Sequence, residues 1–150
     1  MKGSKMTVKK KKILFLCTGN SCRSQMAEGF AKKLRGAEFE VYSAGIEAHG
    51  LNPHALKVMA EIGIDISNQK SQNINEFMNM DIDTVITVCG HAHETCPLFP
   101  SGAKIIHAPF PDPPVLAARL KEKGEKNKGL LEPYKEVRDK IQQFIVKMEI

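Results

Sequence analysis

Residues 13–24, Ile-Leu-Phe-Leu-Cys-Thr-Gly-Asn-Ser-Cys-Arg-Ser, constrain the fold of this chain more than any other segment. An apolar run suited to a buried strand ends at Cys17, and five residues separate that cysteine from Arg23. If these five residues form a tight loop before a helix, their backbone N–H groups converge on the cysteine sulfur and form a cradle for an oxyanion. The segment therefore predicts a strand–loop–helix unit in which a thiolate attacks a bound tetrahedral oxyanion.

Strand-like and helix-like segments alternate along the rest of the chain. The predicted strands are residues 12–17, 39–45, 83–88 and 104–107. The predicted helices follow the loop as far as Gly36, run from Asn52-Pro53 to Gly63, and start again at Pro133. This alternation favours an α/β fold, a single three-layer domain in which helices flank a four-stranded parallel sheet.

Helical periodicity also predicts which side chains each helix buries. The predicted inward-facing residues are Met26, Ala27, Phe30, Ala31 and Leu34 in the first helix, Leu56, Met59 and Ala60 in the second, and Tyr134, Val137, Ile141, Phe144, Ile145 and Met148 in the last. Two further stretches have the composition of loops. Residues 109–114 contain four prolines around Asp112 and predict a stiff loop, whereas residues 121–129 are highly charged and predict a solvated one.

Three reactive side chains follow predicted strands. Cys17 ends the first strand, Cys89 comes directly after residues 83–88, and Asp112 lies shortly after residues 104–107. In open parallel sheets, ligands bind beyond the carboxyl ends of the strands. We therefore expect these three side chains to meet at one edge of the sheet.

The charge of the chain is concentrated at its start. The 150 residues carry a net charge of +5, but six lysines lie within residues 1–12, and the remainder has 16 basic and 17 acidic residues. Residues 1–11 are predicted to be a flexible basic leader before a domain at 12–150, with a nucleic-acid-binding arm as the alternative. Since the chain lacks both an apolar run of roughly 18 residues and a secretory signal, we expect a cytoplasmic monomer that binds neither membranes nor nucleic acid.

The four cysteines differ in their expected roles. In a cytoplasmic protein, cysteines more often react or bind metals than form structural disulfides, and their spacing here matches no familiar zinc site. Cys22 lies inside the loop and is expected to pack, with oxidation as a side reaction. Cys17 alone would suit a buried strand, but the polar loop behind it favours a nucleophile.

Side chains in and beyond the loop suit an oxyanion. Arg23 offers a planar fork that can hold two oxygens. Asn20 tolerates left-handed backbone and can brace the loop with its amide. Ser24 can hold the Cys17 thiolate or a departing sulfur, with a helix N-cap as the alternative, and the two roles can coexist. Asp112 can act as a positioned acid, with a turn-forming Asp-Pro as the alternative.

These features together resemble the low-molecular-weight tyrosine phosphatase superfamily, and more closely its thioredoxin-coupled arsenate reductase branch. The resemblance rests on Cys17–Phe30, Ser43-Ala44-Gly45, Asn52-Pro53-His54, Asp65-Ile66-Ser67 and Asp112-Pro113. The branch adds two cysteines with six residues between them, as Cys89 and Cys96 have here.

The resemblance implies reduction of arsenate by a relay of three cysteines. Cys17 would attack arsenic with Asp112 as proton donor, Cys89 would attack Cys17 and release arsenite, and Cys96 would then attack Cys89. Thioredoxin would reduce the resulting disulfide, no cofactor would be tightly bound, and phosphate would compete with arsenate. The implied substrate-binding residues are Thr18, Gly19, Asn20, Ser21, Cys22, Arg23 and Ser24. Because both Cys17 and Cys96 must reach Cys89, residues 90–95 are predicted to rearrange on oxidation.

Some relatives also bind potassium through side chains that match Asn20, Glu28 and Ser43, together with an acid after the serine at Ser71. This chain has Gln72 at that last position, so the predicted site lacks one negative charge. Two alternatives remain open from the sequence. One is a low-molecular-weight phosphatase acting on phosphate monoesters, which the scarcity of aromatic residues disfavours, and the other is a non-catalytic redox sensor or oxyanion-binding protein.

Overall fold

Four parallel strands form the centre of the structure, a computed structural model that describes residues 9–150. The strands are β1 (Lys11–Cys17), β2 (Phe39–Gly45), β3 (Thr84–Thr87) and β4 (Lys104–His107). Their order across the sheet is β2-β1-β3-β4, and all three neighbouring pairs are parallel. The predicted α/β fold with a four-stranded parallel sheet is confirmed.

The central strand β1 is buried on both faces of the sheet. Residues 13–16 are completely inaccessible to solvent, as expected for a continuous apolar run in a covered parallel sheet. Burial of each such side chain stabilises the fold by roughly 1.5–3 kcal/mol. The register pairs Cys17 with Gly45, so β1 delivers its cysteine at the carboxyl edge of the sheet.

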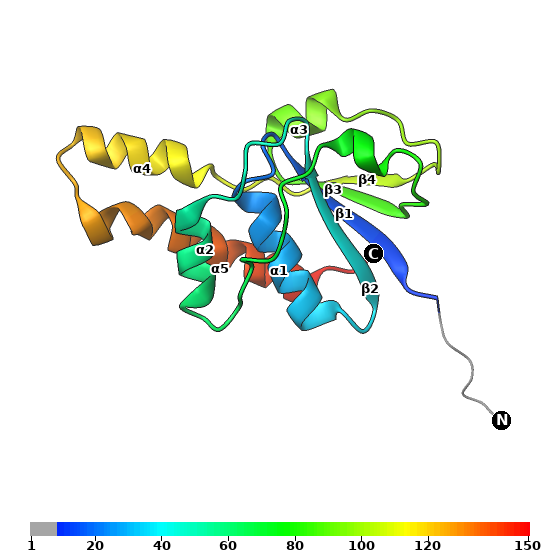
Figure 1. Cartoon of the computed structure of the whole chain (residues 1–150), viewed down its shortest axis with the longest axis horizontal. Helices are drawn as coiled ribbons and strands as arrows, with labels where there is room; N and C mark the ends of the chain where they lie inside the picture. The colour runs from blue at the N-terminus through cyan, green and yellow to red at the C-terminus, as the bar shows by residue number, and fades with distance from the viewer. Residues whose placement is uncertain (1–8) are drawn as a thin grey trace.

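Within residues 9–150, five α-helices and two short 3₁₀ helices surround the sheet. They are α1 (Arg23–Arg35), α2 (Pro53–Ala60), η2 (Ile74–Phe77), α3 (Gly90–Thr95), α4 (Pro113–Glu122), η3 (Asn127–Leu131) and α5 (Glu132–Lys147). Figure 1 shows α1, α2 and α5 together on one side of the sheet, whereas α4 and the start of α5 extend away from it. As predicted, Asn52 caps α2 by accepting the backbone N–H groups of His54 and Ala55.

Four predicted inward-facing positions are wrong or only partly buried, and one of them, Phe144 in α5, is half-buried. Leu34 is 43% exposed, because α1 buries residues only as far as Ala31. In α2, Ala60 is exposed and Leu56 half-buried, while Ala55 and Val58 are buried instead. The face of a short helix is set by its packing partners, here α5 and α1, and two turns of sequence determine that rotation poorly.

Two predicted loops contain helices. Within residues 109–114, Pro113 opens α4 and Asp112 is its N-cap residue, which suits proline because the first helical N–H has no partner to lose. Within residues 121–129, α4 continues to Glu122 and η3 starts at Asn127. Since α4 buries only Pro113, it lacks the apolar stripe by which a helix is recognised in a sequence.

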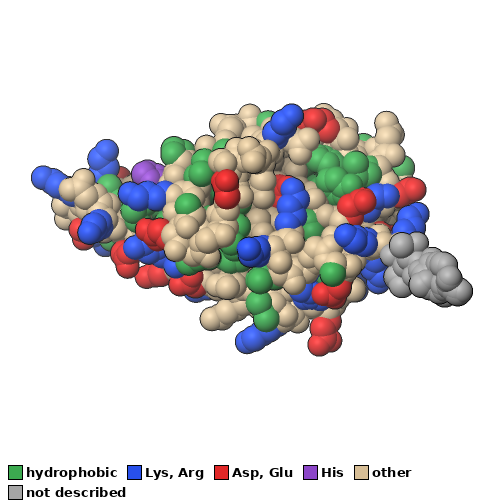
Figure 2. Space-filling model, turned by 60° about the horizontal axis from the view of Figure 1, so that its bottom comes forward, with side chains coloured by type: hydrophobic (Ala, Val, Ile, Leu, Met, Phe, Trp, Pro, Cys, Tyr) green, Lys and Arg blue, Asp and Glu red, His purple; other side chains and the backbone are tan. Residues whose placement is uncertain are grey.

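The boundary of the predicted leader also changes. β1 begins at Lys11, which pairs with Phe39, so this last residue of the predicted leader belongs to the sheet. Residues 1–8 of that leader lie outside the described residues. Figure 2 shows basic and acidic side chains interspersed over one face of the molecule. Among residues 9–150, no helix has the length and apolar character needed to cross a membrane.

Candidate active site

The loop between β1 and α1 turns its carbonyl groups outward. Six consecutive carbonyls, those of residues 17–22, accept hydrogen bonds of 2.8 to 3.1 Å. Their donors are the backbone N–H groups of Ile46, Glu47, His49, Asn52 and Met26 and the side-chain amide of Gln25. Every peptide bond among the described residues is trans, so the N–H group of each of these peptide units points the opposite way. The loop is therefore a cradle of inward-facing donors, as the sequence predicts.

Asn20 sets the shape of this cradle. Its φ of 49° lies in the left-handed region, which asparagine tolerates better than most residues. Its side-chain amide donates to Ser24 Oγ at 2.8 Å and to Ser43 Oγ at 2.9 Å, and its Oδ1 accepts the N–H of Gln72 at 2.7 Å. Gly45 completes the packing, because a Cβ there would lie 2.7 Å from the Asn20 nitrogen. The predicted bracing role of Asn20 is confirmed.

Ser24 is aimed at the sulfur of Cys17. Its Oγ lies 2.8 Å from Cys17 Sγ, and both side chains are buried. Because Asn20 donates to the same oxygen, the Ser24 proton is free to point toward the sulfur. The alternative role of Ser24 as a helix cap is wrong, since the N-cap residue of α1 is Cys22. A hydroxyl donor at this position stabilises a thiolate.

Arg23 connects the cradle to the segment that carries Asp112. Its guanidinium donates to the carbonyl of Phe110 at 3.0 Å and lies 3.6 Å from Asp112 Oδ2. Asp112 makes no side-chain capping bond to α4, so its carboxylate is not committed to the helix that it precedes. This geometry favours a positioned acid over a turn-forming aspartate.

Cys89 lies beside the cradle. Its Sγ is 3.2 Å from Thr18 Oγ1, the residue that follows Cys17. Cys89 is buried and is the N-cap residue of α3, where its sulfur accepts the N–H of Ala92 at 3.4 Å. The sheet thus brings Cys17, Cys89 and Asp112 to one edge, as the order of the strands predicts. The contact with Thr18 had no signal in the sequence.

Cys96 lies at the other end of α3. It is half-buried and follows the last helical residue, Thr95. Burial raises the pKa of the Cys96 thiol. Cys89 and Cys96 flank this six-residue helix and are seven positions apart, which corresponds to about 10 Å along a helix, beyond the roughly 7 Å between the Cα atoms of a disulfide. Residues 90–95, predicted without a helix, therefore form one that must unwind before Cys89 and Cys96 can bond.

The fourth cysteine has a different environment. Cys22 is buried, and desolvation, followed by the nearby Cys17, raises the pKa of its thiol far above its ordinary value. A thiol that stays protonated is a poor nucleophile. The predicted packing role of Cys22 fits this environment.

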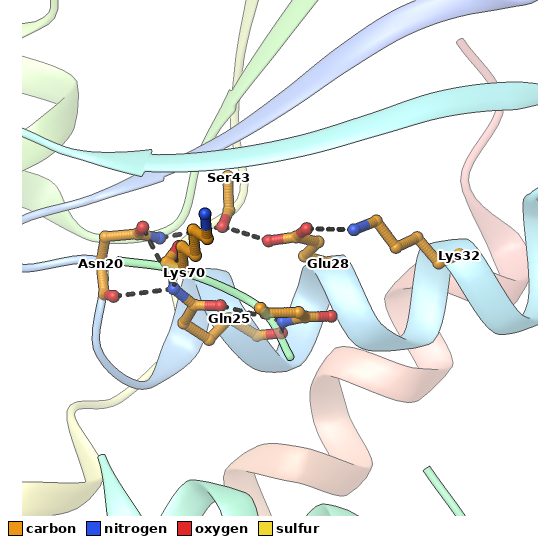
Figure 3. Close-up of polar contacts among 7 residues, drawn as sticks. Asn20, Gln25, Glu28, Lys32, Ser43 and Lys70 are labelled. Carbon is orange, nitrogen blue, oxygen red and sulfur yellow. Dashed lines mark hydrogen bonds and ion pairs between the residues drawn. The ribbon is translucent and has the colours of Figure 1, made fainter. Parts of the chain in front are cut away.

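A chain of buried polar groups leads from the cradle to the surface (Figure 3). Ser43 accepts from Asn20 and donates to Glu28, and Glu28 also binds the ammonium group of Lys32 one helical turn away. Gln25 joins the cluster by donating to Asn20. Neither Gln25 nor Lys32 had been singled out from the sequence, because each is an ordinary residue for a helix.

These side chains do not fit the potassium ion that the resemblance implies. The amide oxygen of Asn20 is used by the N–H of Gln72 and by Gln25. The carboxylate of Glu28 already has a cation in Lys32. The ammonium group of Lys32 supplies the positive charge next to Glu28.

Comparison with known proteins identifies a family and several relatives that share this fold. Residues 12–149 match the family described as low molecular weight phosphotyrosine protein phosphatase. An arsenate reductase of Halalkalibacterium halodurans is 60% identical over 104 residues, which are 69% of this chain and 75% of that protein.

Two solved structures extend the comparison. One, described as an arsenate reductase in reduced state, is 37% identical in sequence and has a TM-score of 0.68. The match covers 91% of this chain and 94% of the chain in that structure. A thioredoxin-dependent arsenate reductase of Corynebacterium glutamicum is 26% identical with a TM-score of 0.63, over 93% of this chain and 62% of that one.

Proposed function

The chain belongs to the low molecular weight phosphotyrosine protein phosphatase family, and we propose that it reduces arsenate to arsenite by a relay of three cysteines. The observation that carries this proposal is the position of Cys89, whose sulfur lies 3.2 Å from Thr18, next to Cys17. A phosphatase needs the cradle, Arg23 and an acid, but it has no use for a second thiol there. Reduction needs two electrons, which a pair of thiols supplies when it becomes a disulfide.

The first step uses the cradle. Residues 18–24 bind arsenate through their inward-facing N–H groups, and Arg23 adds a positive charge. The Cys17 thiolate, held by Ser24, attacks arsenic and forms an arsenic–sulfur bond. The displaced group is the hydroxyl of monoprotonated arsenate, which takes a proton from Asp112 and leaves as water, so arsenic remains in the +5 state.

The second step is the reduction. The thiolate of Cys89 attacks the sulfur of Cys17, and a Cys17–Cys89 disulfide forms. The electron pair of the arsenic–sulfur bond moves to arsenic, which leaves as arsenite in the +3 state. The contact between Cys89 and Thr18 supports this step, because it holds the second thiol beside the first.

The third step moves the disulfide outward. Cys96 attacks Cys89, the Cys17–Cys89 bond breaks, and Cys17 leaves as a thiolate ready for another cycle. Because α3 separates Cys89 from Cys96, it must unwind during this transfer. Unwinding also exposes Cys96, which removes the burial that raises the pKa of its thiol.

Thioredoxin is the proposed reductant of the Cys89–Cys96 disulfide. The similarity to a thioredoxin-dependent arsenate reductase supports this assignment. A thioredoxin partner and free thiols both belong to a reducing compartment, so we place the protein in the cytoplasm. Phosphate has the charge and shape of arsenate and is expected to compete for the cradle.

A coupled assay tests the proposal. The protein, arsenate, thioredoxin, thioredoxin reductase and NADPH should give arsenate-dependent loss of NADPH. The Cys96→Ser variant should release about one arsenite per protein and then stop, since its Cys17–Cys89 disulfide cannot move outward. As a control, Cys17→Ser should release none. If wild type hydrolyses a phosphate monoester steadily but consumes no NADPH with arsenate, the phosphatase alternative is correct.

A further inference from the structure

Helix α3 is held against the sheet by few contacts. Its one buried side chain is Ala92, whereas His91, His93 and Glu94 are exposed to solvent. Thr95 donates only to the carbonyl of His91 within the same helix. A helix of this length has little stability of its own, so the contacts that tie it to the sheet decide how readily it unwinds.

Two histidines and a threonine provide one such tie. Thr87 in β3 is completely buried, and its Oγ1 lies 3.1 Å from Nδ1 of His93 in α3 and 2.9 Å from Nδ1 of His107 in β4. The two imidazole rings stack, with centroids 4.2 Å apart and planes inclined by 24°. We call Thr87, His93 and His107 the histidine latch. Among the described residues, it holds the only side-chain hydrogen bond between residues 90–95 and the sheet.

The hydrogen-bonding capacity of Thr87 makes the histidine latch a unit. A threonine hydroxyl has one proton to donate and two lone pairs. The hydroxyl can therefore accept the Nδ1–H of one ring while its proton goes to Nδ1 of the other ring or to the carbonyl oxygen of Ile106, which lies 3.4 Å from the same Oγ1. In this arrangement His107 aligns the hydroxyl and stacks on His93, so both histidines hold α3 in place.

We propose that the histidine latch stabilises the reduced, helical form of α3 and so makes the Cys89–Cys96 disulfide easier to reduce. The proposal rests on the proposed function, in which these two cysteines form the disulfide that thioredoxin reduces. Contacts made in the dithiol form and lost in the disulfide form shift the equilibrium toward the dithiol. Forming the disulfide unwinds α3 and carries His93 away from Thr87. Reduction lets the helix and the histidine latch form again.

The sign of the effect separates this proposal from simple helix propensity. Alanine favours helices more than histidine does, so a His→Ala change that acts through propensity alone stabilises the dithiol form. Loss of the histidine latch does the opposite. His91 is the matched control, because it lies in the same helix and its side chain makes no hydrogen bond to the sheet.

The test measures the Cys89–Cys96 equilibrium in thiol–disulfide buffers, in a Cys17→Ser background that prevents pairing with Cys17. Alkylation and mass spectrometry give the fraction oxidised. His93→Ala should shift the equilibrium about fivefold toward the disulfide, which corresponds to a potential lower by about 20 mV. His91→Ala should give no shift or a small one toward the dithiol. An unchanged equilibrium in His93→Ala, or an equal shift in His91→Ala, overturns the proposal.

A second variant approaches the histidine latch from another element. His107→Ala in β4 should shift the equilibrium in the same direction, and the double variant should shift it by less than the sum, because both residues act through Thr87. Amide hydrogen exchange of α3 in the reduced protein should be faster in both variants, and additive shifts with unchanged exchange contradict the histidine latch. If no Cys89–Cys96 disulfide forms in any buffer, the proposed function fails and the histidine latch with it. If the disulfide forms at an unchanged potential, only the histidine latch fails.

Discussion

At the scale of single residues, the hydrogen bond between Ser24 and Cys17 is the most direct side-chain contact with the nucleophile. Among the described residues, Ser24 is the only one whose side-chain hydroxyl forms a hydrogen bond with Cys17 Sγ, at 2.8 Å. Replacing Ser24 with alanine removes that hydroxyl. A hydrogen bond to a charged group contributes roughly 1.5–3 kcal/mol. We expect kcat/KM for arsenate to fall about tenfold to a hundredfold, with alkylation of Cys17 by iodoacetamide at neutral pH slowed to match. Unchanged alkylation would show that Ser24 only packs.

Lys32 acts on the same network from farther away. Its ammonium group binds Glu28, whose side chain is only 9% exposed. In Lys32→Met, the Glu28 carboxylate keeps only its hydrogen bond from Ser43. Because the Lys32 side chain is half-exposed in the wild type, its ion pair is screened by water, and the free energy of unfolding should fall by only about 1 kcal/mol. We expect kcat/KM to fall a few-fold, because Glu28 orients Ser43 and thereby Asn20. Lys32→Arg should restore it.

Two controls accompany this prediction. Lys33→Met removes a charge from the adjacent, exposed position and should change neither stability nor turnover. Wild-type turnover should be equal in sodium and potassium salts at matched ionic strength, since Lys32 already supplies the cation at Glu28. A clear preference for potassium would contradict the assignment.

Local spacing explains which site residues the sequence reveals. Asn20 and Ser24 were predicted because they lie within a few residues of Cys17, where a tight loop leaves little conformational choice. Thr18 was predicted as a substrate-binding residue, but its contact with Cys89 was not, and Lys32, which contacts Glu28, was not predicted at all. Lysine at i+4 from a glutamate is common on any helix, so nothing in the sequence marks this pair as part of a site.

At the scale of elements, α3 links the chemistry of the two resolving cysteines. Burial in the folded chain raises the pKa of the Cys96 thiol, so less of it is thiolate at a given pH. Alkylation of Cys96 in the reduced protein should be slower at pH 8 than in a synthetic peptide of residues 92–100. The alkylation rate of Cys96 in the protein should keep rising with pH beyond the point at which the alkylation rate of the peptide has levelled off. Equal profiles would mean that α3 does not shield Cys96.

Two of the elements missed from the sequence, α3 and α4, each bury a single side chain. α3 buries Ala92 and α4 buries Pro113, so neither has a periodic apolar face. By contrast, β1 and α5 bury several large side chains each, and both were predicted. The sequence therefore reveals the scaffold of the sheet better than the short helix that moves during the proposed reaction.

At the scale of the whole molecule, the parallel sheet gathers residues that are far apart in the chain. Cys17, Cys89 and Asp112 follow three neighbouring strands, β1, β3 and β4, and the carboxyl ends of parallel strands share one edge. That rule made their convergence predictable without any motif. The distances within the site depend on loops and on Arg23, which contacts both Phe110 and Asp112.

The buried groups of this fold also predict how stability depends on alkaline pH. Burial raises the pKa of Cys22 from its ordinary value of 9.0, and burial with a hydrogen bond to Glu40 raises that of Tyr42 from 10.0 to about 12. As pH rises past about 9, the unfolded chain loses the Cys22 proton and the folded chain keeps it. The free energy of unfolding therefore falls, by about 1.4 kcal/mol per pH unit for one proton.

Urea denaturation of the reduced protein between about pH 8 and about pH 11 measures this dependence. Cys22→Ala removes one titrating group from both the folded and the unfolded state. The free energy of unfolding of this variant should therefore fall less steeply with pH than that of wild type, and the two slopes should differ by the contribution of one proton. Tyr42→Phe should flatten the curve only above about pH 10, where the unfolded tyrosine begins to ionise. If wild type and Cys22→Ala lose stability in parallel, the Cys22 thiol ionises as easily in the folded protein as in the unfolded chain. The site would then hold a second thiolate next to Cys17, and Cys22 would have to be counted among its nucleophiles.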